Sequence, residues 1–572
     1  MIAALSPSAP ISPSTPPSTQ RTLTYATRPC SGAPGKRLAL AQTLAHVLPS
    51  VNRYTLRELK IQNILQNPRL RHEVLFEPKL EFRPNTSGNM ADAKHVATQQ
   101  YWAAIEKGMS GWNPKALHTG DCRMSCGAAD LSMVPVLLAE IREILAEMSE
   151  DAPNMAMARY AVELRERLDD ERIRQQIDNN VFDPEPVVEY LAQVMRKLAR
   201  PEHFASIDRL IEYARSGRFA RALRMSFDVL EVLKIDIANR SIEMYREYMR
   251  STAVAYERSH FGNMLRRNSV PIDETRAWWK KEYDAARGQF QSLDDIFSHV
   301  FRTLVLGGDR PVPKLMHMDE ARINGIRREY ERLEIVGYLF MGFTQFIQAV
   351  GRATASTGEP SDQQQQPEFR TENGRVDFER LGKECLKLVP ECFVVNWSDS
   401  IGDSTAGEWR MPAGARGEVR ASVLVTQLVS LAGRVLGRKI QPAEVTQLWR
   451  AVRSVVQSGS PVRGIVAGRI RSAVEMHLSS LEVNSTRFRG DAWEAMPEDA
   501  KLMLRRSMLG FLEPVLSSLA IKVHAIRAHH WLVYKSFYQA LISSNSQLVQ
   551  QTVTVAKAPS ASSAAVAQSR AL

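Results

Sequence analysis

Residues 228–249 read DVLEVLKIDIANRSIEMYREYM, and this stretch decides the fold. It contains no Pro or Gly, so no residue in it interrupts a helix. Over its first half apolar residues lie on nearly every side of a helix, whereas a surface helix carries only an apolar stripe. These residues are Val229, Leu230, Val232, Leu233, Ile235, Ile237 and Ala238. The pattern predicts a buried core helix at the centre of the molecule.

Five polar side chains interrupt this apolar background, namely Glu231, Lys234, Asp236, Asn239 and Arg240. Each needs a partner, because burying an unpaired polar group costs free energy. The spacing allows Glu231 to meet Lys234, and Asp236 to meet Arg240, on the helix. We interpret the five residues as a structural polar network that fixes helix packing. The alternative is a recessed site for a ligand or a partner.

The length of 572 residues predicts a few subdomains or one large helical body. The longest apolar runs, such as Val336–Phe340, are far shorter than the roughly 18 to 20 residues that span a membrane, so we expect no transmembrane segment. The start of the chain lacks the charged and apolar regions of a secretory signal. The five cysteines are an odd and sparse set, typical of reduced thiols in the cytosol or nucleus: Cys30, Cys122, Cys126, Cys385 and Cys392.

The net charge of +11 is unevenly distributed. Residues 1–57 contain six Arg or Lys and no acid, and residues 416–489 contain twelve Arg or Lys and four Glu. Such asymmetry attracts acidic proteins, anionic lipid or nucleic acid. The only aromatic residues in 416–489 are Trp449 and Phe488, which argues against recognition by base stacking. We expect no sequence-specific nucleic acid partner, and anionic lipid or an acidic protein surface fits this region better. A solvated helical face is the simpler interpretation.

Three segments have compositions that cannot bury enough apolar surface to become ordered. Residues 1–50 are rich in Ser, Pro and Thr, residues 351–375 contain a run of four Gln, and residues 549–572 are rich in Ala and Ser. We predict a disordered tail at each end and a disordered insertion between. The Ser-rich, acid-free start is also compatible with mitochondrial import, but its prolines oppose the helix that such a signal needs. We expect a cytoplasmic protein that can also be nuclear.

Residues 51–89 predict an arm that packs on the body. Leu56 and Ile64 belong to a short helical pattern, whereas Pro68, Pro78 and Pro84 favour an extended or turning path. The residues expected to anchor the arm are Phe76, Leu80 and Phe82.

Helical patterns follow one another over two subdomains, 90–350 and 376–548. Alternation of β-branched residues is almost absent before residue 390. The sequence also shows no alternation of strands with helices, so we expect no parallel sheet. The sequence therefore predicts an all-α fold, either a large multi-helix bundle or an irregular helical stack. Residues 390–415 form a long polar loop with Trp397 and Trp409. The expected helices are 91–107, 130–149, 153–167, 169–179, 184–199, 205–215, 218–250, 251–267, 272–288, 292–306, 316–350, 376–388, 419–436, 441–457, 463–483, 497–520 and 521–546.

Three blocks together resemble the T-complex protein 11 family, whose fungal members are suppressor-of-kinase proteins. They are Glu171–Pro201, the core helix with its continuation FDVLEVLKIDIANRSIEMYREYMRSTAVAYERSHF, and the C-terminal GFLEPVLSSLAIKVHAIRAHHWLVYKSFYQALI. The arm, ELKIQNILQNPRLRHEVLFEPKLEFRPN, is similar to the N-terminal segment of the fungal subgroup. One departure is Leu198–His203, which stands where the family has Cys-Ala-Pro-Xaa-Arg-Asp. This departure weakens any role assigned to that turn.

The resemblance implies an all-α protein without known enzymatic activity. It also implies an association with cyclic-AMP and protein kinase A signalling, including suppression of kinase loss in fungi and sperm function in animals. The expected partners are therefore proteins of kinase signalling.

Two further groups of residues are candidates for contacts. His317, Asp319, Arg322, Arg327 and Arg328 open the predicted helix 316–350. A basic first turn is unfavourable beside the positive end of a helix, so an anionic partner or acids within the chain must compensate.

Arg266-Arg267-Asn268-Ser269-Val270 places two arginines three and two residues before a serine. A basophilic kinase pairs such guanidinium groups with acids in its cleft, so Ser269 is a candidate for phosphorylation. Pro271 predicts that the serine lies in an exposed turn between helices.

The familiar catalytic and cofactor-binding motifs are absent from the sequence. It has no Gly-x-Ser-x-Gly, phosphate-binding loop, His-Glu-x-x-His or dinucleotide fingerprint. His118, Cys122 and Cys126 lack the second ligand pair that a structural zinc site needs. We expect no catalytic residue, no cofactor and no metal. The sequence predicts a non-enzymatic helical signalling regulator or adaptor in the cyclic-AMP/protein kinase A pathway. The alternative is a peripheral protein that binds anionic membrane surfaces through the basic C-terminal helices.

Overall fold

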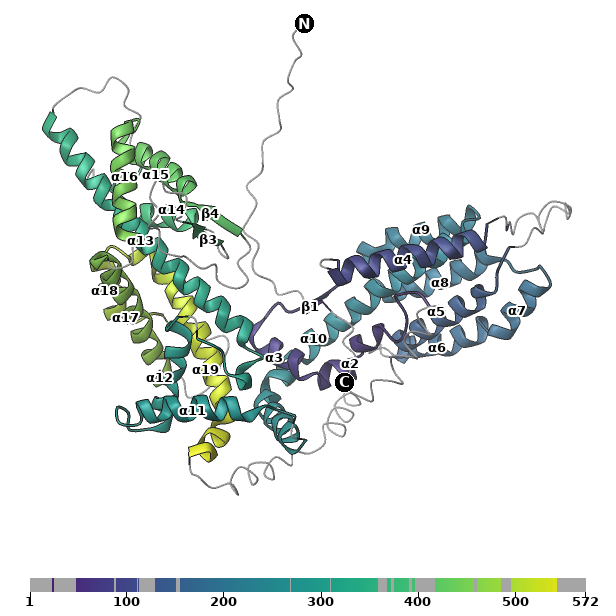
Figure 1. Cartoon of the computed structure of the whole chain (residues 1–572). Coiled ribbons are helices and arrows are strands. Elements are labelled where there is room, and N and C mark those ends of the chain that lie inside the picture. Colours follow the sequence, from purple (N-terminus) through teal and green to yellow (C-terminus); the bar gives the residue numbers. More distant parts are fainter. Residues whose placement is uncertain are drawn as a thin grey trace, which may run out of the picture. The chain divides into compact units, whose positions relative to one another are not determined.

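The chain forms two compact units, Met1–Ala253 and Val254–Leu572, in the computed structural model. The structure describes residues 23–24, 48–86, 89–110, 112, 129–150, 155–267, 269–308, 310–357, 368–371, 375–389, 393–396, 417–456, 460–484 and 495–542. Over these residues the fold is almost entirely helical, which confirms the predicted all-α class (Figure 1).

Unit 1 is built from an arm, a series of helices and most of one long helix. In chain order its elements are β1 (Leu23–Thr24), η1 (Leu56–Leu59), α2 (Ile61–Gln66), α3 (Pro68–Phe76), β2 (Phe82–Arg83), α4 (Asn89–Gly108), α5 (Met133–Glu150), α6 (Met155–Arg167), α7 (Asp170–Asp178), α8 (Pro184–Leu198), η3 (Pro201–His203), α9 (Phe204–Arg215) and the larger part of α10 (Phe219–Arg266).

Helix α10 is the longest element, with 48 residues. It runs through the predicted boundary at 250–251 without a break, because no proline and only one glycine, Gly262, occur in it. Two expected helices, 218–250 and 251–267, are therefore one. Leu230, Leu233 and Ala238 are fully buried, as the apolar pattern of the opening stretch predicts.

Local signals set several helix ends in unit 1. Asp183 caps α8 by accepting a hydrogen bond from the Glu185 N–H, and Pro184 occupies the first helical position. Helix α9 ends at Arg215, and Gly217, with a φ of +74°, closes the turn before α10. Only a residue without Cβ adopts this conformation at no steric cost.

The arm contributes to the core of unit 1, but it is more helical than predicted. Pro68 does not break the path. It starts α3, where a missing N–H does no harm, and Asn67 caps this helix. Leu80 and Phe82 are buried as expected, whereas Phe76 is half-buried. The apolar residues that the arm adds to the core include Leu56, Leu59, Ile64, Leu70 and Val74.

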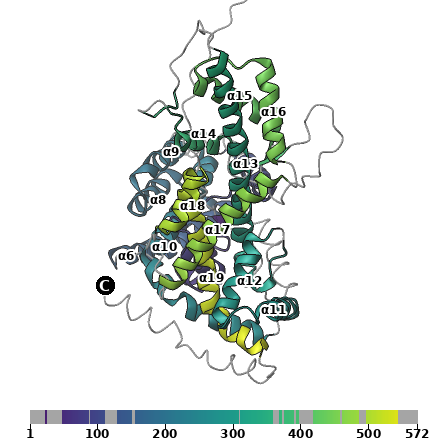
Figure 2. The same ribbon diagram turned by 90° about the vertical axis from the view of Figure 1, so that its left-hand side faces the viewer.

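Unit 2 contains the end of α10 and all later helices. Its elements are α11 (Ile272–Ala286), α12 (Leu293–Leu306), η4 (Lys314–Met316), α13 (Glu320–Thr357), α14 (Phe378–Leu388), β3 (Phe393–Asn396), β4 (Gly417–Arg420), α15 (Ala421–Leu436), α16 (Pro442–Val456), α17 (Pro461–Asn484), α18 (Glu498–Arg506), η5 (Gly510–Leu512) and α19 (Glu513–Ile542). Figure 2 shows α13, α17, α18 and α19 packed beside one another.

Aromatic rings fill the part of the unit 2 core between α11, α12 and α19. Trp279 is fully buried and donates from Nε1 to the Tyr538 carbonyl at 3.3 Å. Phe297 lies 4.4 Å from Trp531, between ring centroids, in a stacked arrangement. Aromatic contacts of this kind add about 0.5–1.5 kcal/mol each beyond the area they bury.

Helix α13 is the central helix of unit 2. Its stretch Glu320–Ala353 is long and apolar enough to cross a membrane by length and composition, although we expected no such segment. Within its most apolar window 67% of the helix is buried inside the protein, which is the behaviour of a core helix. Gly337 and Gly342 allow the close approach of α17 and α16.

Three expected element boundaries are wrong. The predicted helix 497–520 is interrupted after α18, because Met508 has a φ of +57° and Gly510 begins η5. Helix α19 then runs without a break to Ile542. The predicted helix 316–350 begins later, at Glu320, after the short helix η4, and continues to Thr357.

Part of the predicted disordered insertion 351–375 is ordered. Beyond the end of α13, Phe369 is 1% exposed and its ring lies between the guanidinium groups of Arg380 and Arg434, at 5.3 and 5.1 Å. An aromatic ring held by two cations and by its own burial is enough to order this short segment. The Gln run lies outside the described residues.

Two short parallel strand pairs depart from the prediction of no sheet. Strand β1 pairs with β2, which ties Leu23 and Thr24 of the predicted tail to the arm. Strand β3 pairs with β4, so the ends of the predicted loop 390–415 lie side by side. Runs of two to four residues are too short for a recognisable period. Trp397, Trp409 and residues 549–572 lie outside the described residues.

The structure divides the chain at Ala253–Val254, inside α10, whereas we expected a division at 351–375. The reason is that α11 packs on α12 and α19, and α12 packs on α13 and α19. The C-terminal helix α19 thus completes a core whose first elements lie more than two hundred residues earlier in the chain.

Two glycines give a matched test of packing in unit 2. An added Cβ at Gly382 would overlap the ring of Phe511, whereas at Gly468 no heavy atom lies within 4 Å. We expect Gly382→Ala to lower the free energy of unfolding by about 1–3 kcal/mol through overpacking. Gly468→Ala should raise it by up to about 1 kcal/mol through helix propensity. Urea unfolding of both variants measures this, and changes of the same sign would contradict the packing.

Candidate functional site

Polar side chains in the middle of α10 contact other segments of unit 1. Lys234 is 2% exposed, although it bears a charged group. Glu231 forms an ion pair with Lys94 of α4, with 2.8 Å between Oε1 and Nζ. The pair joins two helices that are more than a hundred residues apart in sequence, which no local spacing rule could predict.

Asp236 faces the turn that connects α8 and α9. Its Oδ2 lies 2.9 Å from Nε2 of His203 and 3.7 Å from Nε of Arg200. The side chain of Asp236 is 13% exposed, so this carboxylate is largely shielded from water. This turn belongs to Leu198–His203, the segment that departs from the family pattern. The structure shows that the turn contacts the core helix.

The same turn brings together groups that could hold a metal ion. Ligand atoms of Glu202, His203 and Asp236 lie within 4.8 Å of one another. However, Arg200 lies 3.8 Å from Glu202 and 3.7 Å from Asp236, so its positive charge already compensates part of the charge of these two carboxylates. We interpret the cluster as an ion-paired turn, because a cation there would meet a guanidinium group.

Asn239 holds the arm through two backbone hydrogen bonds. Its Oδ1 accepts from the Phe82 N–H at 2.6 Å, and its Nδ2 donates to the Phe82 carbonyl at 3.0 Å. This amide therefore satisfies both polar backbone groups of one residue of strand β2. Arg246 extends the attachment by donating to the carbonyls of Glu77 and Leu80, at 3.0 and 3.4 Å.

Three of the five polar residues of α10 make contacts away from the helix. Glu231, Asp236 and Asn239 each reach a different segment of unit 1. Arg240 is exposed, and the expected Asp236–Arg240 ion pair is absent from the contacts of these two described residues. The residues act as separate ties, and the tertiary structure supplies their partners.

Asn239→Ala tests the attachment of the arm. It leaves two backbone groups of the buried Phe82 without partners, so we expect the free energy of unfolding of unit 1 to fall by about 1–3 kcal/mol. Amide exchange at residues 80–83 should become faster. Arg240→Ala, one position further and exposed, is the matched control and should change stability by less than about 0.5 kcal/mol. Equal effects of the two variants would refute the role of Asn239.

In unit 2, the residues that carry the family resemblance also form ties. Glu257 and His529 are almost fully buried, and their side chains approach to 3.0 Å. Arg258 donates from Nε to the Leu532 carbonyl at 3.0 Å. The end of α10 is therefore joined to the middle of α19 by two contacts that use neighbouring residues on each helix.

The candidate contact residues at the start of α13 lie largely inside the protein. Asp319 and Arg322 form a buried ion pair at 2.8 Å. Arg327 is 8% exposed and donates to the carbonyls of Leu304, at the end of α12, and of Arg310. Asp319 and these backbone carbonyls therefore provide partners within the chain for Arg322 and Arg327. Arg328 is half-buried, and His317 precedes the helix.

A cluster of charges between α12, α17 and α19 was not predicted. Glu482 receives two guanidinium groups, from Arg302 and from Arg527. Arg527 also donates to the Ser298 hydroxyl at 2.9 Å. The three residues come from helices that no sequence motif relates, and the only available signal was a charged residue on an otherwise apolar helix face.

This cluster predicts a dependence of stability on pH. Burial, together with the charges of Arg527 and Arg302, lowers the pKa of His524 to about 4, so the folded protein holds this imidazole neutral. Below the ordinary pKa of about 6.5, His524 binds a proton in the unfolded chain but stays neutral in the folded protein. Acid therefore favours the unfolded chain, and the stability falls between pH 6.5 and 4. Since His524 is half-buried, solvent reduces this loss to about 1–2 kcal/mol.

His524→Gln should remove that part of the acid sensitivity. The exposed His299→Gln serves as a control in the same unit and should leave the pH profile unchanged. Urea unfolding at pH 6.5, 5.5 and 4.5 measures the difference. A wild-type profile in the His524 variant would contradict the buried neutral imidazole.

The remaining candidates are the buried cysteine, the His/Cys group and the basic stretch. Burial raises the pKa of the Cys385 thiol to about 12, so it stays protonated and is a poor nucleophile. His118, Cys122 and Cys126 lie outside the described residues. Of the basic stretch 416–489, several arginines are occupied within unit 2: Arg434 pairs with Glu368, Arg438 pairs with Glu444, and Arg471 donates to the Leu306 carbonyl.

The fold and these ties define a class of all-helical proteins whose polar core residues join distant helices. The sequence profile of T-complex protein 11 matches residues 70–543, and the chain belongs to this family. Its relatives include protein SOK1 of Saccharomyces cerevisiae, 25% identical over 325 residues, which are 52% of this chain and 34% of the yeast protein.

Animal relatives match shorter stretches. The T-complex protein 11 homolog of Rattus norvegicus is 25% identical over 199 residues, 35% of this chain and 31% of the rat protein. T-complex protein 11 of Mus musculus is 28% identical over 156 residues, 27% of this chain and 26% of the mouse protein. The chain thus spans about a third or less of the length of these relatives. No solved structure matches it significantly.

Proposed function

We propose that the chain is a non-enzymatic regulator or adaptor in cyclic-AMP/protein kinase A signalling and acts through protein–protein contacts in the cytoplasm. The observation that supports this most is the family match over residues 70–543, together with the similarity to yeast SOK1. The signalling role is the one that the family resemblance implies, and the family is not a known family of enzymes.

The use of the polar residues supports a role without catalysis. In the described part of unit 1, Glu231, Asp236 and Asn239 are engaged by Lys94, His203 and Phe82. An active site instead gathers titratable groups around an open position where a substrate can lie. Side chains that already tie helices together are poorly placed for that work.

The outer side of α10 offers a surface for a partner. Arg240, Glu243, Met244 and Glu247 are all exposed and recur at the three- and four-residue spacing of one helix face. Met244 is 57% exposed, an unusual degree for a methionine on a helix whose other side is core. Methionine and arginine are enriched at protein interfaces, so this face is our candidate contact surface.

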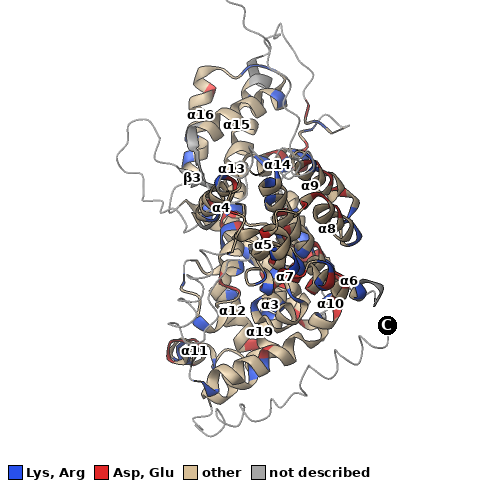
Figure 3. Ribbon diagram, turned by 90° about the vertical axis from the view of Figure 1, so that its right-hand side faces the viewer, with Lys and Arg blue, Asp and Glu red and all other residues tan. Residues whose placement is uncertain are grey.

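The membrane alternative has less support. Arg434, Arg438 and Arg471 are bound to groups of unit 2, which leaves fewer charges for an anionic lipid surface. In unit 1, Lys and Arg positions are mixed with Asp and Glu positions along the helices (Figure 3). Lipid binding through a basic region needs several uncompensated cations close together.

Expression in fungal cells deficient in protein kinase A tests the proposal. We expect the chain to restore growth, and Met244→Asp to abolish the effect, because a charge at the centre of the contact surface opposes apolar packing. Val162→Asp on α6 is the matched control, since Val162 is 56% exposed in the same unit, and it should retain activity.

Circular dichroism and thermal unfolding of both variants establish that each is folded. A folded and expressed wild-type chain that restores no growth would refute the pathway. Full activity of Met244→Asp would refute the contact surface and leave the pathway standing. Flotation with anionic liposomes tests the membrane alternative, because that alternative requires binding that depends on salt concentration.

A further inference from the structure

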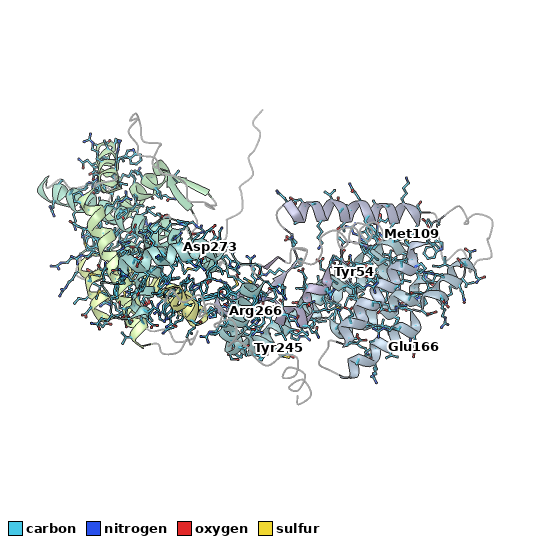
Figure 4. All side chains as sticks on the ribbon, turned by 60° about the horizontal axis from the view of Figure 1, so that its bottom comes forward. Tyr54, Met109, Glu166, Tyr245, Arg266 and Asp273 are labelled. Atoms are coloured by element: carbon cyan, nitrogen blue, oxygen red, sulfur yellow. The ribbon has the colours of Figure 1, made fainter. Side chains whose placement is uncertain are left out.

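The segment between α10 and α11 contains an exposed serine that follows two exposed arginines. Helix α10 ends at Arg266 and α11 begins at Ile272, so Ser269 lies outside both helices. Arg266, Arg267 and Ser269 are all exposed. Figure 4 labels Arg266, on the α10 side of the segment, and Asp273, in the first turn of α11.

Ser269 closes the C-terminal turn of α10. Its backbone N–H and its hydroxyl both donate to the Met264 carbonyl, each at 3.1 Å. The bond from the N–H spans five residues, which is the pattern of a Schellman-type helix end. Among the described residues, the hydroxyl makes only this one bond, at the end of a helix, so the serine can leave the turn without disturbing the core of unit 2.

We propose that Ser269 is a phosphorylation site for a basophilic serine/threonine protein kinase. Arg266 and Arg267 stand three and two residues before it, where two guanidinium groups pair with carboxylates of the kinase cleft. The kinase transfers the γ-phosphoryl group of Mg-ATP to Oγ. The new O–P bond forms as the bond to the β-phosphate oxygen breaks, the hydroxyl proton passes to the kinase's aspartate, and ADP leaves.

Position, as well as the residue pattern, selects this serine. Ser472 also has nearby arginines, Arg469 and Arg471, and it is exposed. It lies, however, in the middle of the 24-residue helix α17, whose backbone bonds would have to open before the segment could become extended. Ser269 needs no helix to unfold, because the chain has already left α10.

Phosphorylation changes how the turn is held. The phosphate removes the hydroxyl donor from the Met264 carbonyl and adds about two negative charges at the negative end of α10. Arg266 and Arg267 are close enough in sequence to bind the phosphate instead, and charge-assisted hydrogen bonds are about twice as strong as neutral ones. The modified turn is therefore held by arginine–phosphate contacts in place of the Ser269–Met264 bond. This control point goes beyond the proposed function and does not rest on it.

Incubation of the full chain with Mg-ATP and the catalytic subunit of a cyclic-AMP-dependent kinase tests the proposal. Mass spectrometry should find about one phosphate per chain, on Ser269. Ser269→Ala should remove it, Arg267→Ala should slow incorporation by roughly tenfold or more, and Ser472→Ala should change nothing. After phosphorylation, the amide of residue 269 should exchange faster with solvent.

Two results would overturn the inference. One is no incorporation into the wild-type chain while the kinase phosphorylates its standard peptide in the same tube. The other is an unchanged yield in Ser269→Ala, which would place the phosphate elsewhere. Neither result depends on rescue of growth, so failure here is distinguishable from failure of the proposed function.

Discussion

The structure of unit 1 depends on one constraint: the polar groups that α10 carries into an apolar core must find partners there. A buried and unpaired carboxylate or amide is costly, so the arm, α4 and the α8–α9 turn are held where their groups can meet this helix. Asn239 shows the principle most clearly, because one amide satisfies both backbone groups of Phe82. At this point the arm is the two-residue strand β2, and the side chain of Asn239 supplies partners for its backbone in addition to the pairing with β1.

Unit 2 solves the same problem with contacts between polar side chains of different helices, some of them ion pairs. Glu257 meets His529, and Glu482 meets Arg302 and Arg527. Such buried pairs add little net stability, because removing the charges from water costs about as much as their attraction returns. Their consequence is specificity, since helices whose apolar faces could slide past one another are held in a single register.

The location of a residue, inside the protein or on its surface, also bears on the function. Residues that looked most like a site, because they are polar on an apolar helix, are engaged in holding the fold. The features that remain available are exposed: the Met244 face of α10 and the Ser269 turn. Met244 lies on α10 and Ser269 closes the C-terminal turn of α10, so a contact or a phosphate at either place acts on this long helix.

The sequence by itself determined the all-α class, the buried character of α10, the positions of most helices and the family. These follow from local rules, namely apolar periodicity, helix caps and the absence of Pro, which depend on neighbours within a few residues. Only the tertiary structure decided that Asp236 pairs with His203 instead of Arg240, that Phe369 is buried between two arginines, and that the chain divides inside α10. Partners distant in sequence have no spacing rule, because the approach of two side chains depends on how whole helices pack, and packing is a property of the complete chain.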